Sequence, residues 1–150
     1  MKEPRVQQKL DHFVAHCKRR GLSVTHQRLA VYQALLASPD HPTAEQIFKR
    51  VRQRYPTISL ATVYKTLDTL ESEGLISKIT FLPDAARYDA NIEHHHHLVC
   101  VRCHRVDDLP ASLLERVKIP EDAAKDYRIL GFSVQFNGLC PRCQRRGRRS

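Results

Sequence analysis

The sequence predicts an α+β protein made of an N-terminal winged helix-turn-helix domain over residues 1–90 and a smaller α/β domain over residues 91–150. Three observations support this fold class. Apolar residues recur at helical spacing through the first half of the chain. After Gly74 the pattern changes to the alternation typical of short strands. The second half carries two Cys-x-x-Cys pairs, which indicate a metal site within that smaller domain.

Composition indicates a folded, basic protein of a reducing compartment. The chain has 150 residues, of which 41% are hydrophobic, and its longest apolar runs are too short to span a bilayer. Its N-terminus lacks the apolar segment of a signal peptide, so we expect a cytoplasmic protein. Five cysteines in that compartment favour metal ligation over disulfides. The formal charge of +9 favours a polyanionic partner, nucleic acid first, although a basic protein without such a partner is the alternative.

The first two helices are predicted from spacing and caps. Residues 6–20 place their apolar side chains at helical spacing, and Gly21 ends this helix. Its basic end at residues 18–20 is either a solvated helix terminus or an arm that contacts phosphate. Thr25 is a favourable N-cap for the second helix. The first quarter of the chain is therefore expected to form a helical pair.

Two further helices follow a loop at residues 39–42. The third begins with a capping box, Thr43-Ala-Glu-Gln46, and runs to about Arg54. Ser59 caps the fourth, which runs to about Glu73. Four helices with short connections are thus expected before the hydrophobic pattern changes from helical spacing to strand alternation.

A β-hairpin is expected directly after the fourth helix. Residues 75–82 and 86–90 read as short strands around a Pro83-Asp84-Ala85 turn. Helices followed by such a hairpin form a winged helix-turn-helix, whereas a plain helical bundle would explain neither the hairpin nor the charge. The fourth helix is then the recognition helix, and Tyr64 either joins the core or reaches a thymine methyl group. Its exposed positions suit close approach to a duplex: Ser59, Ala61, Thr62, Lys65, Thr66 and Thr69.

The second domain is expected to be a small sheet with one short helix. A strand at residues 98–101 leads into a turn, and a return strand begins at Val106. Residues 110–118 read as a short helix with Leu113, Leu114 and Val117 facing inward. Residues 127–137 alternate as a strand. The basic tail after Cys143 is expected to add nonspecific affinity for phosphate.

The two cysteine pairs predict a closed tetrahedral thiolate site. Four thiolates with no open position are the donor set of structural zinc. Four unrelated buried thiols would not explain the paired spacing, and no βαβ pattern supports a thioredoxin-like pair. The remaining Cys17 lies at an apolar helical position and is expected in the core. The predicted zinc ligands are Cys100, Cys103, Cys140 and Cys143.

Four consecutive histidines, residues 94–97, lie beside carboxylates just before the first cysteine pair. On an extended chain alternate residues share a face, so the second and fourth can converge while the first and third point the other way. Imidazoles with carboxylates suit Fe(II) or Mn(II), and a histidine of the first domain could close the set. Metal occupancy would then set the angle between the domains; the alternative is a solvated polar edge. The predicted regulatory ligands are His41, Asp89, His95, His97 and Asp108.

Hydrolytic zinc motifs are absent from the sequence. The His-Glu-x-x-His pattern fails because Ile92 precedes Glu93. The deaminase signature fails because Pro141 follows Cys140 rather than preceding it. We therefore predict that the chain is not an enzyme, and a zinc-dependent nucleic-acid enzyme is the alternative from a different class.

Five motifs follow one another between residues 10 and 143. They are Gly-Leu-Ser-Val-Thr-His-Gln-Arg at 21–28, His-Pro-Thr-Ala-Glu at 41–45, Ser-Leu-Ala-Thr-Val-Tyr at 59–64, the histidine-rich stretch into Cys-Val-Arg-Cys at 100–103, and Cys-Pro-Arg-Cys at 140–143. In this order they resemble the ferric uptake regulator family of bacterial metal-dependent repressors. The resemblance implies a homodimer, a C-terminal α/β dimerisation domain, an inverted-repeat operator and a position near DNA for Tyr64.

The resemblance also implies how the regulatory site works. The peroxide-sensing branch of the family uses three histidines and two aspartates that match the five ligands named above, with His41 or His95 as the oxidised histidine. Iron-uptake members typically carry Glu where this chain has Asp89 and Asp108. Many members place a histidine shortly before the third cysteine. The stretch before Cys140 has none here, which argues against a second exchangeable site.

The sequence therefore predicts a metal-dependent, DNA-binding transcriptional repressor with structural Zn²⁺ and regulatory Fe²⁺ or Mn²⁺. We expect it to respond to peroxide; the alternative is an iron-uptake or other metal-uptake repressor of the same fold. Its expected partners are a second copy of the chain and double-stranded operator DNA, and no membrane. The residues assigned to DNA contact are Lys18, Arg28, Ser59, Ala61, Thr62, Tyr64 and Lys65.

Overall fold

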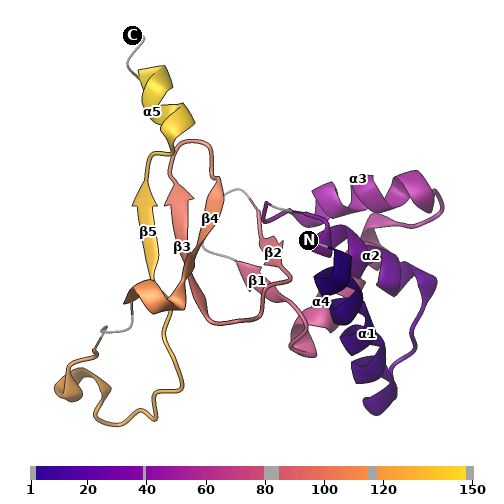
Figure 1. Ribbon diagram of the computed structural model, residues 1–150, viewed down its shortest axis with the longest axis horizontal. Coiled ribbons are helices and arrows are strands. Elements are labelled where there is room, and N and C mark those ends of the chain that lie inside the picture. Colours follow the sequence, from indigo (N-terminus) through magenta and orange to yellow (C-terminus); the bar gives the residue numbers. More distant parts are fainter. Residues whose placement is uncertain (1–2, 39, 80–84, 115–117, 148–150) are drawn as a thin grey trace. The chain divides into compact units, whose positions relative to one another are not determined.

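The computed structural model describes residues 3–38, 40–79, 85–114 and 118–147 (Figure 1). The chain divides into two compact units, Met1–Ile92 and Glu93–Ser150. The first unit is mainly helical, and the second contains a three-stranded sheet, so the protein has the α+β fold that the sequence predicts. Among the described residues, no helix combines the length and the apolar character that crossing a membrane requires.

Four helices make up most of the first unit, and their ends follow the predicted caps. Thr25, Thr43 and Ser59 each accept a hydrogen bond from the backbone N–H three residues further on. Thr43 and Gln46 complete the capping box. Gly21 has a φ of 67°, a left-handed conformation that glycine adopts without strain and that ends the first helix. The helices are α1 (Glu3–Arg19), α2 (His26–Leu36), α3 (Ala44–Arg54) and α4 (Leu60–Ser72).

A two-stranded wing follows α4. Strands β1 (Ser77–Ile79) and β2 (Arg87–Asp89) pair in antiparallel register, with Lys78 opposite Tyr88. The expected hairpin is therefore present, although its first strand is shorter than the predicted 75–82, and residues 80–84 lie outside the described part. The helices α3 and α4 with this wing form the winged helix-turn-helix.

The core of the first unit lies where the four helices meet. Phe13 of α1 stacks on Tyr32 of α2 with ring centroids 4.8 Å apart. From α4, Val63 and Leu67 are fully buried. The expectation that Thr66 is exposed was wrong: its side chain is 5% exposed, because it follows Val63 by three positions and shares its face of the helix. Helix α4 is thus anchored by one continuous buried stripe.

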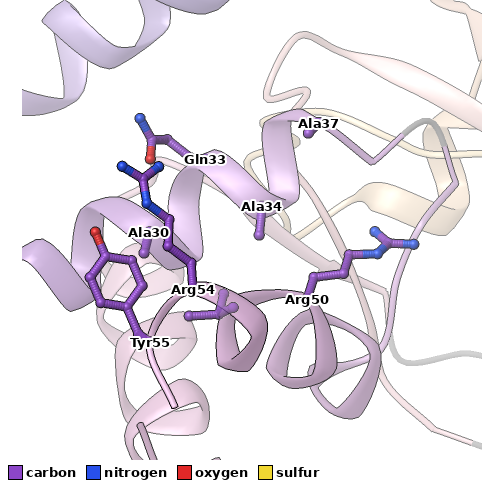
Figure 2. A pocket seen from close by; sticks show the side chains of 8 residues that line it. Ala30, Gln33, Ala34, Ala37, Arg50, Arg54 and Tyr55 are labelled. Atoms are coloured by element: carbon purple, nitrogen blue, oxygen red, sulfur yellow. The ribbon is translucent and has the colours of Figure 1, made fainter. Parts of the chain in front are cut away.

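A groove of about 340 Å³ lies between α2 and α3 (Figure 2). Its α2 wall is made largely of alanines, whose short side chains leave space beside α3. Arg50 and Arg54 of α3 project along it. The guanidinium of Arg50 lies 3.6 Å from the carboxylate of Asp40, and that of Arg54 lies over the Tyr55 ring. Helix α3 therefore presents an exposed basic face on a different side from its buried face.

The second unit is built on a mixed sheet with the strand order β4-β3-β5 (Figure 1). The central strand pairs antiparallel with β4 and parallel with β5. All but the first of the four consecutive histidines lie in β3 itself, which begins earlier than the predicted 98–101. A short helix follows β5 directly. The elements are β3 (His95–Cys100), β4 (Val106–Pro110), β5 (Gln135–Gly138) and α5 (Pro141–Gly147).

Two expectations for the second unit need correction. The helix predicted over residues 110–118 is a single 3₁₀ turn at Ala111–Leu114, and Leu113 is exposed rather than inward; residues 115–117, with Val117, lie outside the described part. The strand predicted over 127–137 is confined to β5, because only this segment hydrogen-bonds to β3 as a strand. Alternation of apolar residues alone does not supply a pairing partner.

Candidate metal centres and nucleic-acid interface

The four predicted zinc ligands come together at one end of the β3–β5 pair. Cys100 ends β3 and Cys103 lies in the following turn, while Cys140 precedes α5 and Cys143 lies within it. Because β3 and β5 are parallel, their C-terminal ends bring both pairs to the same edge. The four sulfur atoms lie within 4.8 Å of one another. Zn–S bonds of about 2.3 Å give a tetrahedron with S–S edges of about 3.8 Å, and the Sγ atoms of Cys103 and Cys140 are 3.7 Å apart.

The electrostatics of this cluster suit a divalent cation. The backbone N–H of Cys140 donates to Sγ of Cys100 over 3.4 Å, and this bond with a second from Cys103 lowers the pKa of Cys100 to about 5. The N–H of Cys143 lowers the pKa of Cys140 in the same way. Burial, then the neighbouring thiols, raise the pKa of Cys143 to about 12. Four clustered thiolates need a counter-charge, which a bound divalent cation would supply as its ligands lose their protons.

Residues between the cysteines hold the cluster together. Arg102 donates from its guanidinium to the carbonyl of Cys143 over 2.9 Å, which joins the first pair to α5. His104 has a φ of 61°, and its N–H donates to the carbonyl of Cys100, so the chain turns tightly after the first pair. Arg102 was not among the residues predicted from the sequence, although its place inside a Cys-x-x-Cys motif is a signal for such a contact.

His95 and His97 converge on one face of β3, as strand alternation predicts. Their ring centroids are 4.7 Å apart. Asp108 of β4 lies opposite His97 in the register, and its carboxylate oxygen is 3.3 Å from Nε2 of His95 and 3.6 Å from Nε2 of His97. Nδ1 of His95 donates to the carbonyl of Glu93 over 2.6 Å, because a carbonyl can only accept. Nε2, on the other side of the ring, faces the Asp108 carboxylate, an arrangement that suits a bound cation.

His41 and Asp89 form a buried pair in the first unit. Nε2 of His41 lies 3.1 Å from one carboxylate oxygen of Asp89, and the other oxygen accepts the backbone N–H of Asn91. The guanidinium of Arg87 donates to the carbonyl of His41. These bonds fix both side chains, so this unit presents one imidazole and one carboxylate already oriented. The five predicted regulatory ligands are therefore held as a pair in one unit and a trio in the other.

On the opposite face of β3, an aromatic side chain covers the buried His96. His94 and His96 point there, and the ring of Phe132 stacks on His96 with centroids 5.3 Å apart and meets His94 edge-on. The N–H of Val134 donates to Nδ1 of His96. Burial, then the charges of its histidine neighbours, lower the pKa of His96, which keeps the imidazole neutral. Neither residue belongs to a metal-capable group among the described residues. Phe132 thus fills the space on this face.

The exposed face of α4 carries the residues assigned to DNA. Ser59 caps the helix by accepting the N–H of Thr62, and the two hydroxyls are 2.9 Å apart. Ala61, Tyr64 and Lys65 are exposed, and Tyr64 is 39% accessible. Tyr64 is therefore not a core residue, which excludes one of the two alternatives left open by the sequence.

The other two assigned residues lie near helix ends. Lys18 is exposed in the last turn of α1. Arg28 is in the first turn of α2, where its guanidinium donates to the carbonyl of Ser23 over 2.8 Å. Arg28 therefore closes the α1–α2 loop, and Lys18 is the more available of the two for phosphate.

Glu45 is a residue of this surface that the sequence reasoning missed. The hydroxyl of Tyr64 donates to its carboxylate over 2.8 Å, which links α3 to α4. Nothing in local spacing pairs these residues, because they lie 19 positions apart. The only sequence signal was that an acidic residue, Glu45, stands in the first turn of α3 beside an otherwise basic surface.

Comparison with known proteins agrees with this fold. The profile of the ferric uptake regulator family matches residues 19–137. The peroxide-responsive repressor PerR of Staphylococcus epidermidis is 27% identical over 142 residues, which are 95% of each chain.

Solved structures are similar as well. The Helicobacter pylori ferric uptake regulator, described as having three functional metal-binding sites, is 25% identical with a TM-score of 0.78 over 93% of each chain. The Campylobacter jejuni peroxide stress regulator is 32% identical with a TM-score of 0.66, over 89% of this chain and 98% of that one. The sequence match spans most of the chain and the solved relatives share its architecture, so this protein belongs to the ferric uptake regulator family.

Proposed function

We propose that this chain is a cytoplasmic, metal-dependent transcriptional repressor that leaves its operator when peroxide oxidises a histidine of its regulatory site. The observation that carries the proposal is the donor set: three histidines with aspartate, not glutamate, at positions 89 and 108. Peroxide-responsive and peroxide stress regulators are among the relatives that support this choice.

In this proposal, His41, Asp89, His95, His97 and Asp108 bind one regulatory ion. Nitrogen and carboxylate oxygen donors suit Fe(II) or Mn(II), whereas the four thiolates suit zinc. An ion that draws ligands from both units favours the conformation that binds DNA only if its affinity for that conformation is higher, since equal affinities shift nothing. The ordered orientations of the His41–Asp89 pair and of His95 with Asp108 support this assignment.

The proposed signal is a change in one ligand. Fe(II), when bound, supplies the reactivity toward peroxide that Mn(II) lacks. In the net change, peroxide transfers one oxygen atom to the imidazole ring of His41 or His95 and leaves as water. The oxidised ring is a poorer ligand, so the preference for the DNA-binding conformation is lost. The cysteines, already committed to zinc, are expected to oxidise later.

DNA binding is proposed for α4, supported by Lys18 and the basic face of α3. The exposed Tyr64 and Lys65 on α4 and the net charge of +9 support this orientation. A homodimer and an inverted-repeat operator complete the proposal. Exposed apolar side chains in the second unit, such as Leu130 and Phe136, support a partner surface there.

The alternative is an iron-uptake or other metal-uptake repressor. It is favoured by the structural likeness to a ferric uptake regulator, whose TM-score is the higher of the two compared. In that case metal occupancy itself is the signal, and the ligand histidines stay chemically unchanged.

The experiment begins by selecting bound duplexes from a random-sequence pool with the Mn(II)-loaded full-length chain. Binding to the enriched duplex is then measured with Fe(II) under anaerobic conditions, with Mn(II) and with chelator, before and after brief exposure to peroxide. We expect both metals to support binding, and peroxide to abolish it only in the Fe(II) form. Mass spectrometry of tryptic peptides should then show one added oxygen on His41 or His95.

A matched pair of variants tests the site. His95→Gln should lose metal-dependent binding, whereas His94→Gln, on the opposite face of the same sheet, should keep it. Oxidation confined to the cysteines, or equal in the Fe(II) and Mn(II) forms, would favour the metal-uptake repressor instead.

A further inference from the structure

Tyr64 does not stand alone on the exposed face of α4. Its hydroxyl donates to the carboxylate of Glu45 over 2.8 Å, so the ring is tied to the first turn of α3. Ser59 and Thr62 use their hydroxyls in the cap of α4. Base reading by this face therefore depends strongly on where the Tyr64 ring is held.

Glu45 is built to stay ionised in this position. It lies at the positive N-terminal end of α3, where a carboxylate is stabilised. The hydrogen bond from Tyr64, then one from its own backbone N–H, lower the pKa of Glu45, and the same contact raises the pKa of Tyr64. An ionised carboxylate only accepts hydrogen bonds, so the Tyr64 proton is committed to it.

We propose that Glu45 is a positioning residue for sequence selectivity: its carboxylate fixes the Tyr64 ring for contact with a base edge and places a negative charge that opposes nonspecific contact with phosphate. The inference rests on the proposed DNA-binding function. A ring that is already ordered loses less conformational freedom on binding its correct sequence. On random DNA the carboxylate repels phosphate and gains no compensating base contact. Both effects increase the difference in binding affinity between the correct sequence and random DNA.

An ordinary structural role makes a different prediction. If Glu45 only stabilised the start of α3, its loss would lower the melting temperature and weaken all DNA binding by a common factor. A change in the ratio of specific to nonspecific affinity is the readout that separates these roles.

The test uses the Mn(II)-loaded full-length protein, the duplex that it enriches from a random pool, and a scrambled duplex of the same composition. Glu45→Ala should lower the affinity ratio between them about three- to tenfold, the range expected for losing the order of one side chain. Tyr64→Phe removes the same hydrogen bond but keeps the carboxylate charge, so it should lower the ratio by less than Glu45→Ala. The double variant should be no worse than Glu45→Ala, because the shared hydrogen bond can be lost only once.

Two further variants separate charge from position. Glu45→Gln keeps an acceptor for Tyr64, so it should retain more selectivity than Glu45→Ala while binding the scrambled duplex more tightly than the wild type. Glu71→Ala removes the same charge two helical turns from Tyr64 and should preserve the ratio.

Three outcomes would overturn the inference. They are an unchanged ratio in Glu45→Ala, additive losses in the double variant, and an equal loss of ratio in Glu71→Ala. If the wild-type protein enriches no sequence at all, the DNA-binding proposal itself fails, and this inference fails with it. Enrichment of the same motif with the same ratio by wild type and Glu45→Ala refutes only the role of Glu45.

Discussion

Removing zinc should unfold the second unit and leave the first unit folded. The two units differ sharply in how much apolar material they bury. In the described part of the second unit, four hydrophobic residues are buried: Val99, Cys100, Val106 and Cys143. Two of them, Cys100 and Cys143, are proposed zinc ligands. The first unit buries a continuous cluster contributed by all four helices. The second unit therefore has little besides its metal site to hold the sheet.

The magnitudes decide the direction of this prediction. Full burial of an aliphatic side chain contributes about 1.5–3 kcal/mol, so Val99 and Val106 together supply roughly 3–6 kcal/mol. Zinc binding to a structural site contributes about 10–16 kcal/mol at neutral pH. On these magnitudes zinc would be the largest single stabilising contribution in this unit, and its loss would exceed what the two valines can offset. We expect the homodimer to be lost together with the sheet.

The assay compares Cys143→Ser with the wild type before and after a zinc chelator. Bound zinc is quantified per chain, dimer content is measured by light scattering, and β-sheet amide signals are followed by NMR. The matched control is Cys17→Ala, which removes a buried cysteine of the first unit that does not belong to the thiolate cluster. The control should keep zinc and dimer. A chelated protein with an intact second-unit sheet and wild-type dimer affinity would refute the reasoning.

Three other predictions concern the first unit. Lys65→Ala should shallow the slope of log affinity against log salt by about 0.9, measured on the selected duplex, and an unchanged slope would exclude a phosphate contact. Leu67→Ala should lower the free energy of unfolding by about 2–5 kcal/mol in urea titrations, since its side chain is fully buried. Hydrogen bonds from His16, then Arg20, lower the pKa of Glu73 from its ordinary 4.5, so its stabilising effect is complete above that pH and is lost as pH falls through the folded-state pKa. Glu73→Gln should therefore flatten the acid branch of stability, and an acid branch identical to that of the wild type would contradict this.

Local signals predicted the helical unit well. The hydroxyl caps at Thr25, Thr43 and Ser59 and the glycine stops are read from a few adjacent residues, and the structure confirms each cap. The convergence of His95 and His97 followed from strand alternation in the same way. These features depend on backbone geometry over one or two turns, which sequence spacing specifies directly.

Features set by distant partners were not predictable from spacing. The segment at residues 127–134 alternates like a strand but lacks the ladder that β5 forms with β3. Phe132 against His94 and His96, and Glu45 against Tyr64, are contacts made across the sheet or between helices. Thr66 was misplaced because a threonine on a recognition helix invites a DNA-facing role, whereas its helical position faces the core. In each case tertiary packing decides what the local pattern leaves open.

The placement of His41 gives the proposed metal ligand of the first unit a structural route to the proposed DNA-binding surface. His41 directly precedes Pro42, whose carbonyl accepts the N–H of Tyr88 over 2.9 Å, while Arg87 donates to the carbonyl of His41 over 3.2 Å. Thr43, the N-cap of α3, also bridges to Arg87. Residues 41–43 are therefore fastened to the wing strand β2. A displacement of the His41 imidazole that these hydrogen bonds cannot absorb is therefore expected to move the first turn of α3 together with β2. That turn contains Glu45, so such a displacement also reaches the residue that holds the Tyr64 ring.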